Sequence, residues 1–572
     1  MSLRSALSVV IPDETAQVAR AANPRGTTVM WVRDRLDGLF TDEDFAAWFP
    51  PDGRPALSPA RLALHSVLQH VLGLSDRAAA EAVRCRIDVK YALALELDDP
   101  GFHHSVLGDF RDRLLVGDGD RFEELFDLAL GRLKEAGLVN ERGKARTDST
   151  HVLSSVRDLS RLELVVETAR AAVEGLAAHD PGWLAHLVEP GWGRRYGRPA
   201  HRGRMPSTPE SQTKLAVQVG ADGTGILHAV TAPDAPAALR DLPQVQVLRR
   251  VWLQQFVTDG ATRAIRWRTS GAAGDARPPM LGIVSPYDTE VRYTKRASDG
   301  WKGWQVHITE TCDDNRPRVI TDVATVDAPV HDSRTLPAIH DRLAARSLRP
   351  AVHLVDGGYM SVAAADRAGR EHQIQLAGPI RKDTSVQRRK GTGFDKSAFS
   401  IDFDNRVVTC PNGWNSAQWV EPYQTVNGVP YVLAKFGKRH CTPCPLRSQC
   451  TKSETAPRNI SFLPRNLYDL QARMREEQQT PAWRHQYAMR SGVESTMCEI
   501  AVGHRLRRGR YRGQRKTHLQ HVLTAVGINL ERLCAWEQPP PRSRRPPTTL
   551  HQLLTFTGIA HETSWRHSIS PS

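Results

Sequence analysis

The sequence predicts a mixed α/β chain in which a helical N-terminal region precedes a core of strands and helices. Residues 304–311 alternate between apolar and polar side chains, and so do residues 318–326, as is typical of paired strands. The largely apolar run 351–355 predicts another, fully buried strand. Before residue 135, apolar residues recur instead at the spacing of an amphipathic helix.

The helices of residues 1–135 are marked by their start signals. Ser58 is a favoured N-cap, and Pro59 fits the first helical position. Further helices are predicted to begin at Ser75 and Ser105. Short helices with tight turns and exposed arginines resemble a helix-turn-helix DNA-binding module, and a helical packing or assembly domain explains the same pattern.

Between residues 136 and 381 the predicted order is strand, strand, strand, helix, strand, helix, strand. This is the element order of a ribonuclease-H-like α/β core. A segment rich in Pro, Gly and Trp, at about 176–300, interrupts it, and its structure does not follow from pattern. The remaining parts are a Cys-containing insertion, the last helices of the core and a flexible Pro/Arg-rich tail, at 382–480, 481–536 and 537–572.

Charge and composition narrow the class of protein. The 572 residues carry a net charge of +14, which favours an anionic partner, and nucleic acid is the commonest. No apolar run approaches the ~20 residues of a membrane-spanning helix, and we expect no signal peptide. Eight cysteines in so long a chain do not make a disulfide framework, so the reducing cytoplasm is the expected compartment.

Three acidic residues carry the functional prediction. Asp148 falls where a short strand is predicted to end, Asp356 ends the apolar run before a Gly-Gly pair, and Glu494 falls in a predicted helix. Mg²⁺ prefers carboxylate oxygens, and two such ions about 4 Å apart stabilise the attacking and leaving oxygens of a phosphodiester displacement. The three acids therefore predict a two-metal site. Taken singly, each aspartate is more simply explained as a turn residue.

The helix of Glu494 carries two further candidates. Tyr487, Arg490 and Glu494 are spaced to share one helical face. Arg490 is expected to pair with Glu494 or to hold a DNA phosphate through two hydrogen bonds, and a surface ion pair explains the same spacing.

Together these blocks resemble bacterial insertion-sequence DDE transposases. They are Arg-Thr-Asp148-Ser-Thr-His, Leu-Val-Asp356-Gly-Gly-Tyr and Tyr487-x2-Arg490-x3-Glu494, with a basic block downstream. The most similar branch is the insertion-sequence family numbered eleven eighty-two, over about residues 30–536. The resemblance implies a ribonuclease-H-like core and Mg²⁺ (or Mn²⁺) held by Asp148, Asp356 and Glu494. It also implies a homo-oligomer that cuts and joins double-stranded DNA at the element's terminal repeats and at target sites, in the bacterial nucleoid.

Two positions depart from the family pattern. A Lys often found seven residues after the Glu is Ala501 here, with His504, Arg505 or Arg507 as available substitutes. A strand motif of the family, often Gly-Tyr-Lys-Val-His, is Gly303-Trp-Gln-Val-His307 here, so its Lys is replaced by Gln305. Neither change removes a predicted metal ligand. A catalytically inactive DNA-binding protein and a metal-dependent nuclease without strand transfer are the alternatives to an active transposase.

Four cysteines gather in one segment: Cys410, Cys441, Cys444 and Cys450. Four thiolates form the ligand set of a closed tetrahedral zinc site. A metal would also help to order an insertion that has few large apolar residues. Four reduced, unliganded thiols are the alternative.

The stretch 505–516 contains seven basic residues and no acidic one. Because it closely follows Glu494, it predicts a phosphate-binding surface beside the metal site, with Tyr511 available to stack on a base. Charge runs also occur as ordinary solvated faces. The predicted DNA-binding side chains are Arg505, Arg507, Arg508, Arg510, Arg512, Arg515 and Lys516.

Overall fold

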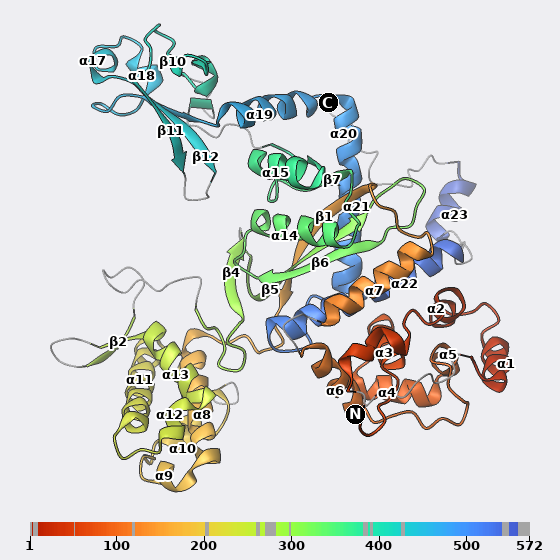
Figure 1. The fold of residues 1–572 in the computed structure, drawn as a ribbon. Coiled ribbons are helices and arrows are strands. Elements are labelled where there is room, and N and C mark those ends of the chain that lie inside the picture. Colours follow the sequence, from red (N-terminus) through yellow and green to blue (C-terminus); the bar gives the residue numbers. More distant parts are fainter. Residues whose placement is uncertain are drawn as a thin grey trace.

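The structure is a computed structural model with a mixed α/β core and several helical or β-rich attachments (Figure 1). It describes residue 3 and residues 10–50, 52–116, 121–200, 205–258, 264–268, 282–296, 299–380, 387–388, 393–424, 429–539 and 548–558.

A six-stranded mixed sheet forms the core. The long strand β5 pairs antiparallel with β1 on one side and with both β4 and β6 on the other, while β7 and β8 continue the sheet parallel to β1. The bounds are β1 Lys144–Leu153, β4 Arg292–Arg296, β5 Asp299–Thr311, β6 Ile320–Asp327, β7 Val352–Leu354 and β8 Gln375–Ala377. The strands predicted at 304–311 and 318–326 are thus confirmed as a pair, and β4 was not predicted.

Helices cover both faces of this sheet, as strand β6 shows. Thr325 hydrogen-bonds His521, whereas Asp322 pairs with Arg342. Residues an odd number apart in a strand face opposite sides. The two layers are therefore α22 with α21 on one face and α14 with α15 on the other (Figure 1). Their bounds are α14 Asp332–Ala345, α15 Val362–His372, α21 Gly492–Cys498 and α22 Gln514–Glu537.

The N-terminal helices share one apolar core with α22. Ser58 and Ser75 accept hydrogen bonds from the N–H groups of Arg61 and Ala78, so both predicted N-caps are confirmed. Gly527 of α22 permits close contact, because a Cβ there would lie 2.8 Å from Val71. The bounds are α1 Asp13–Ala22, α2 Thr28–Leu36, the 3₁₀ helix η1 Asp42–Trp48, α3 Pro59–Val71, α4 Asp76–Cys85, α5 Ile87–Ala92, α6 Ser105–Leu114 and α7 Arg121–Glu135.

The arginines of α6, which were expected to be exposed, contact neighbouring segments of the N-terminal region. Arg111 is buried and forms an ion pair of 2.5 Å with Asp76. Arg113 lies over the ring of Phe49 and donates to the carbonyl of Trp48. The expectation of a free basic face on this helix was wrong, because both guanidiniums find partners on neighbouring segments.

Buried histidines in this shared core predict loss of stability in mild acid. Burial lowers the pKa of His65 to about 4 and that of His70 and His521 to about 3. The unfolded chain therefore binds protons at pH below about 6.5 that the folded chain does not, and stability falls as pH falls. We expect about 2 kcal/mol lost per such histidine between pH 6.5 and 5, measured by urea unfolding.

The substitution His521→Gln should reduce this pH dependence, and the same change at exposed His179 should leave it unaltered. Equal urea midpoints at pH 7 and pH 5 in the unsubstituted protein would contradict the prediction.

The segment at about 176–300, for which no structure was predicted, is largely helical in its described part and has its own apolar core. Helix α11 accommodates glycines because large rings pack on them: a Cβ at Gly223 would lie 2.1 Å from Trp252, and one at Gly220 2.7 Å from Phe256. The bounds are α8 Arg161–His179, α9 Pro181–Ala185, α10 Trp192–Tyr196, α11 Pro209–Thr231, α12 Ala237–Asp241, α13 Pro243–Gln255, β2 Phe256–Thr258 and β3 Ile265–Trp267.

The Cys-containing insertion forms small sheets around a separate core and returns to the sheet through two helices (Figure 1). Its elements are the 3₁₀ helix η4 Lys396–Ala398, β9 Ser400–Asp402, β10 Val407–Thr409, β11 Gln418–Gln424, β12 Pro430–Lys435, α17 Lys438–Cys441, α18 Arg447–Cys450 and β13 Asn459–Phe462, followed by α19 Arg465–Glu477 and α20 Pro481–Ala488.

The predicted flexible tail, 537–572, contains one helix, α23 Thr549–Phe556, in its described part. Most of its Pro/Arg-rich run, 540–547, lies outside the described residues. Within the described part of the chain, no helix combines the length and the apolar character needed to cross a bilayer.

Candidate active site

Strand pairing brings Asp148 and Asp356 together. In the parallel pairing of β1 with β7, Lys144 lies opposite Val352 and Arg146 opposite Leu354, so partners are 208 residues apart. Asp148 and Asp356 are also 208 residues apart, and they fall on the continuation of the same register beyond the end of β7. Asp148 on β1 and Asp356, just after β7, therefore lie side by side at the same level of the sheet.

Asp148 lies in the middle of β1 and not at a strand end as predicted. Pairing with β5 continues for five further residues, to Leu153 opposite Gly303. The polar run after Asp148 remains a strand because β5 supplies a full antiparallel partner, a long-range pairing that local composition does not reveal. Asp356, by contrast, follows the end of β7 as predicted.

Arg490 provides the positive charge beside Asp148. Its Nη2 donates to Asp148 Oδ2 at 3.0 Å, and the N–H of Ser149 donates to Oδ1 at 2.8 Å. Burial nonetheless raises the pKa of Asp148; these two partners oppose the rise, and the charges of Asp356 and Asp332 add to it. The site therefore concentrates negative charge that one guanidinium does not fully compensate.

Asp356 shapes its own turn and also faces this cluster. Its Oδ1 accepts from the N–H groups of Gly358 (2.7 Å) and Tyr359 (3.3 Å), so the turn interpretation of Asp356 is confirmed. A Cβ at Gly358 would lie 2.8 Å from Asp332 Oδ2 and 3.0 Å from Asp356 Oδ1. Glycine at this position therefore leaves room for two carboxylates.

The helix predicted to carry Glu494 is a series of short helical pieces. α20 continues into the 3₁₀ turn η5 Met489–Ser491, then α21, then the π-helix η6 Glu499–Gly503. Arg490 Nη1 lies 3.9 Å from Glu494 Oε1, and the pKa of Tyr487 is raised by burial with further effects of Asp356 and Asp148. Tyr487 and Arg490 thus approach the aspartates, whereas Glu494 lies beside Arg490 with its side chain 71% exposed.

As the side chains stand, the described residues contain no group of three or more His, Cys, Asp or Glu arranged to hold a metal ion. At the acids, Arg490 lies between Asp148 and Glu494. The donor set still fits a hard divalent cation: two partly buried carboxylates, one on β1 and one just after β7, with an exposed glutamate on the adjoining helical segment.

One carboxylate at the site was missed in the sequence. Asp332, the first residue of α14, is 7% exposed and accepts hydrogen bonds from Arg296, Gln305 and Ser149. An acid in a first helical turn is so common that nothing in the sequence distinguished it. Gln305, the departure from the family Lys, thus serves to hold Asp332. Of the substitutes for Lys after Glu494, His504 is engaged with Glu531 at 3.0 Å.

The basic stretch, residues 505–516, lies beside the C-terminal end of β1. The backbone of Arg507 to Gly509 pairs with Leu153 at the end of β1. Arg510 donates to the carbonyl of Leu74, Arg512 lies over the ring of Tyr287, and Lys516 forms a surface ion pair with Asp112. Tyr511, predicted to stack on a base, is half-buried against Arg111. Exposed members are Arg505, Arg507, Arg508, Arg512, Arg515 and Lys516.

The four clustered cysteines line one small cavity of about 30 Å³. Burial raises the pKa of Cys450, with a further rise from the neighbouring thiols of Cys441, Cys410 and Cys444. The four predicted thiols therefore line one cavity, although their side chains as they stand are not arranged to hold a metal ion.

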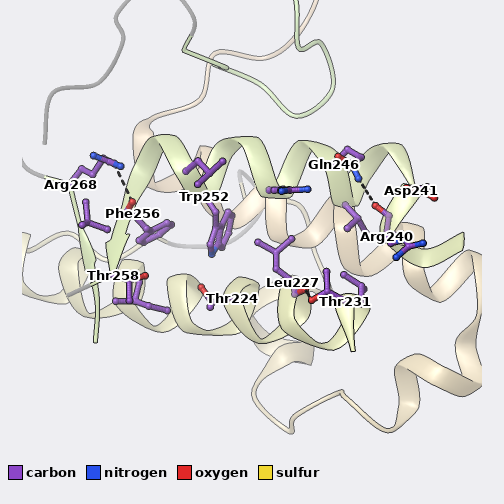
Figure 2. Close-up of a pocket in the computed structure, with 16 residues that line it drawn as sticks. Thr224, Leu227, Thr231, Arg240, Asp241, Gln246, Trp252, Phe256, Thr258 and Arg268 are labelled. Carbon is purple, nitrogen blue, oxygen red and sulfur yellow. Dashed lines mark hydrogen bonds between the residues drawn. The ribbon is translucent and has the colours of Figure 1, made fainter. Parts of the chain in front are cut away.

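A much larger cavity, of about 550 Å³, lies away from the acids, in the helical insertion (Figure 2). Trp252 and Phe256 form part of its wall, together with Leu227 and residues of β2 and β3. Among its described lining residues Asp241 is the only acid, so this cavity offers no carboxylate pair.

Comparison with known proteins gives two family matches. A model described as a transposase DDE domain matches residues 409–534, which include the cysteines and Glu494 but neither aspartate. A second model, described as a transposase domain, matches residues 17–113, the N-terminal helices. No curated protein and no solved structure matches the chain. These two transposase-domain matches on one chain indicate an insertion-sequence DDE transposase.

Proposed function

We propose that this transposase cuts DNA at the ends of its own element and joins the freed 3′-hydroxyl to target DNA, using Mg²⁺ or Mn²⁺. The observation that carries the proposal is the shared register of Asp148 and Asp356, with Arg490 and Glu494 on the adjoining helix. The branch numbered eleven eighty-two and action in the bacterial cytoplasm are part of the same proposal.

The core is proposed to be ribonuclease-H-like. In support, β1, β5 and β6 are antiparallel neighbours, β7 and β8 run parallel to β1, and α14 and α15 connect the strands in the expected order. In open α/β sheets, functional residues gather where parallel strands end, and Asp356 occupies that position.

In this mechanism Asp148, Asp356 and Glu494 are the metal-holding residues. The bound ions would lower the pKa of an attacking water or 3′-hydroxyl and stabilise the leaving oxygen. Arg490, which now neutralises Asp148, is suited to bind a DNA phosphate with its fork of donors when a cation replaces it. Glu494 has the exposure needed to turn toward the aspartates.

A strand-transfer assay tests the proposal. The full chain is incubated with a labelled fragment that carries the element's end, a target plasmid and Mg²⁺. Cut ends joined to the plasmid support the transposase. Cutting without joining would favour the nuclease, and end binding without metal-dependent cutting would favour a DNA-binding protein. Assembly as a homo-oligomer on paired ends is proposed from the family resemblance, and crosslinking of the complex on DNA tests it.

The exposed arginines of the basic stretch are proposed to bind phosphates. Replacing Arg505, Arg507 and Arg508 by Gln should make the dependence of log binding constant on log salt less steep, by about 0.9 for each phosphate that the variant no longer neutralises. Lys516→Gln is the control, because Lys516 is already paired with Asp112. An unchanged slope in the triple variant would assign DNA binding elsewhere.

The cysteine cavity is proposed to hold a structural Zn²⁺. Cys410, Cys441, Cys444 and Cys450 supply four thiols at one cavity, and elemental analysis of the purified chain should give about one zinc per chain. Cys441→Ser and Cys450→Ser should each abolish metal binding and destabilise this insertion. Exposed Cys498→Ser is the matched control. Full reaction of all four thiols with a thiol reagent, even after Zn²⁺ has been added to the folded protein, would exclude the site.

A further inference from the structure

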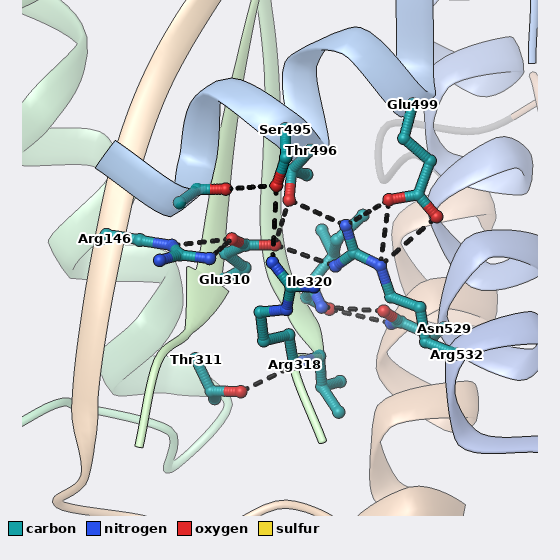
Figure 3. A network of polar contacts seen from close by, with 12 residues as sticks. Arg146, Glu310, Thr311, Arg318, Ile320, Ser495, Thr496, Glu499, Asn529 and Arg532 are labelled. Carbon is teal, nitrogen blue, oxygen red and sulfur yellow. Dashed lines mark hydrogen bonds and ion pairs between the residues drawn. The ribbon is translucent and has the colours of Figure 1, made fainter. Parts of the chain in front are cut away.

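Arg146 connects the strand of Asp148 to the helical segment that carries Glu494. Figure 3 shows its ion pair with Glu310 on the neighbouring strand. Its guanidinium is almost fully buried and donates to the carbonyl oxygen of Met489, the residue before Arg490. Arg146 and Asp148 are two residues apart in β1, so they share one face of the strand. The same strand face therefore contacts the helical segment twice, through Arg146 at Met489 and through Asp148 at Arg490.

Gly492 provides the space that this contact needs. A Cβ at Gly492 would lie 2.2 Å from Nη1 and 2.7 Å from Cζ of Arg146, well inside van der Waals contact. The guanidinium cannot easily give way, because its Nε donates to Glu310 Oε1 at 2.7 Å and Glu310 is its direct cross-strand partner on β5. Any larger residue must therefore displace the helix from the strand.

The second carboxylate oxygen of Glu310 contacts the same helical segment. Glu310 is fully buried, and its Oε2 accepts from Thr496 of α21 and from Arg532 of α22, each at 2.8 Å. Arg532 also pairs with Glu499, so two cations and two anions balance in a network that joins β1, β5, α21 and α22 (Figure 3). Met489, Gly492 and Thr496 follow the spacing of one helical face toward the sheet.

We propose that Arg146 and Gly492 form a positioning pair that sets the spacing between Asp148 and Glu494. The inference rests on the proposed function, since it concerns how the metal-holding acids are brought to one distance. Neither residue touches the reacting atoms. A purely structural contact would affect stability alone, whereas a positioning pair affects metal affinity and cleavage in a chain that still folds and binds DNA.

The test uses the full chain with Gly492→Ala. We expect end cleavage to fall about 100-fold, as for a displacement near 1 Å, and Mn²⁺ affinity, measured by electron paramagnetic resonance, to fall about tenfold. Binding of the end fragment should be unchanged. Gly503→Ala is the matched control: Gly503 ends the π-helix of the same segment, and a Cβ there would meet nothing within 4 Å.

A mutant cycle separates this contact from helix propensity. In the background Arg146→Met with Glu310→Gln, both partners of the ion pair are replaced, and adding Gly492→Ala should then change Mn²⁺ affinity and cleavage by less than about twofold. If Gly492→Ala alone fails to fold, this triple variant should fold, because it lacks the clashing guanidinium.

Gly492→Ala that matches the unsubstituted protein in Mn²⁺ affinity and cleavage would overturn the positioning pair alone. An equal loss with and without Arg146 would do the same. Unsubstituted protein that neither binds Mn²⁺ nor cuts would overturn the proposed function, and this inference with it.

Discussion

Asp148→Asn, Asp356→Asn and Glu494→Gln are each expected to abolish metal-dependent cutting while leaving DNA binding intact. Each removes a charged oxygen donor without changing side-chain size, and several kcal/mol of lost transition-state stabilisation corresponds to about 10³-fold in rate. Gel-shift and cleavage assays on the same end fragment measure the two properties separately. The effect should be as large for exposed Glu494 as for partly buried Asp148, which a role in folding would not produce.

Asp314→Asn is the matched control for this series. Asp314 is 77% exposed and pairs with Lys144 near the other end of β1. It should cut at the unsubstituted rate. Full cutting by any one of the three site variants would remove that residue from the proposed metal-holding set.

Glu310→Ala is expected to be the most destabilising single change in the core. It would leave Arg146 and Arg532 facing each other in a buried space without their shared carboxylate. Removing one partner from a buried charge network costs about 3–5 kcal/mol. Native-state hydrogen exchange of the β1 and β5 amides measures this loss locally, at the strands that carry the network.

Glu499→Ala removes an acid from the same network at its exposed rim, where Glu499 is 35% exposed. It should cost less than about 1 kcal/mol. Similar losses for the two variants would mean that solvent reaches Glu310 and that the network does not hold the helix.

Local patterns predicted those elements whose cause is local. Only a few neighbouring residues were needed to predict the N-caps at Ser58 and Ser75, the alternation in β5 and β6 and the apolar run before Asp356. The long helix α11 escaped prediction because its glycines disfavour a helix until Trp252 and Phe256 pack on them. Propensity was overridden there by packing from residues about thirty positions away.

The candidate site divides in the same way. Asp148, Asp356, Tyr487, Arg490 and Glu494 were recognisable because each stands in a distinctive short block. The position of Asp148 in mid-strand depends on β5, which follows more than 140 residues later. Asp332, and the roles of Arg146 and Gly492, depend on contacts between segments far apart in the chain, for which a single sequence holds no signal.

The pairing of β1 with β7 has a consequence for how such a chain can change over generations. The whole helical insertion is encoded between the two aspartates, yet it has a separate apolar core, and their alignment is set by hydrogen bonding between strands. We therefore expect that residues can be gained or lost in the insertion without disturbing the alignment of the two aspartates. A slip of one residue inside β1 or β7 is different, because it would turn one carboxylate to the opposite side of the sheet. Changes in length should therefore be tolerated in the helical insertion but not within β1 or β7.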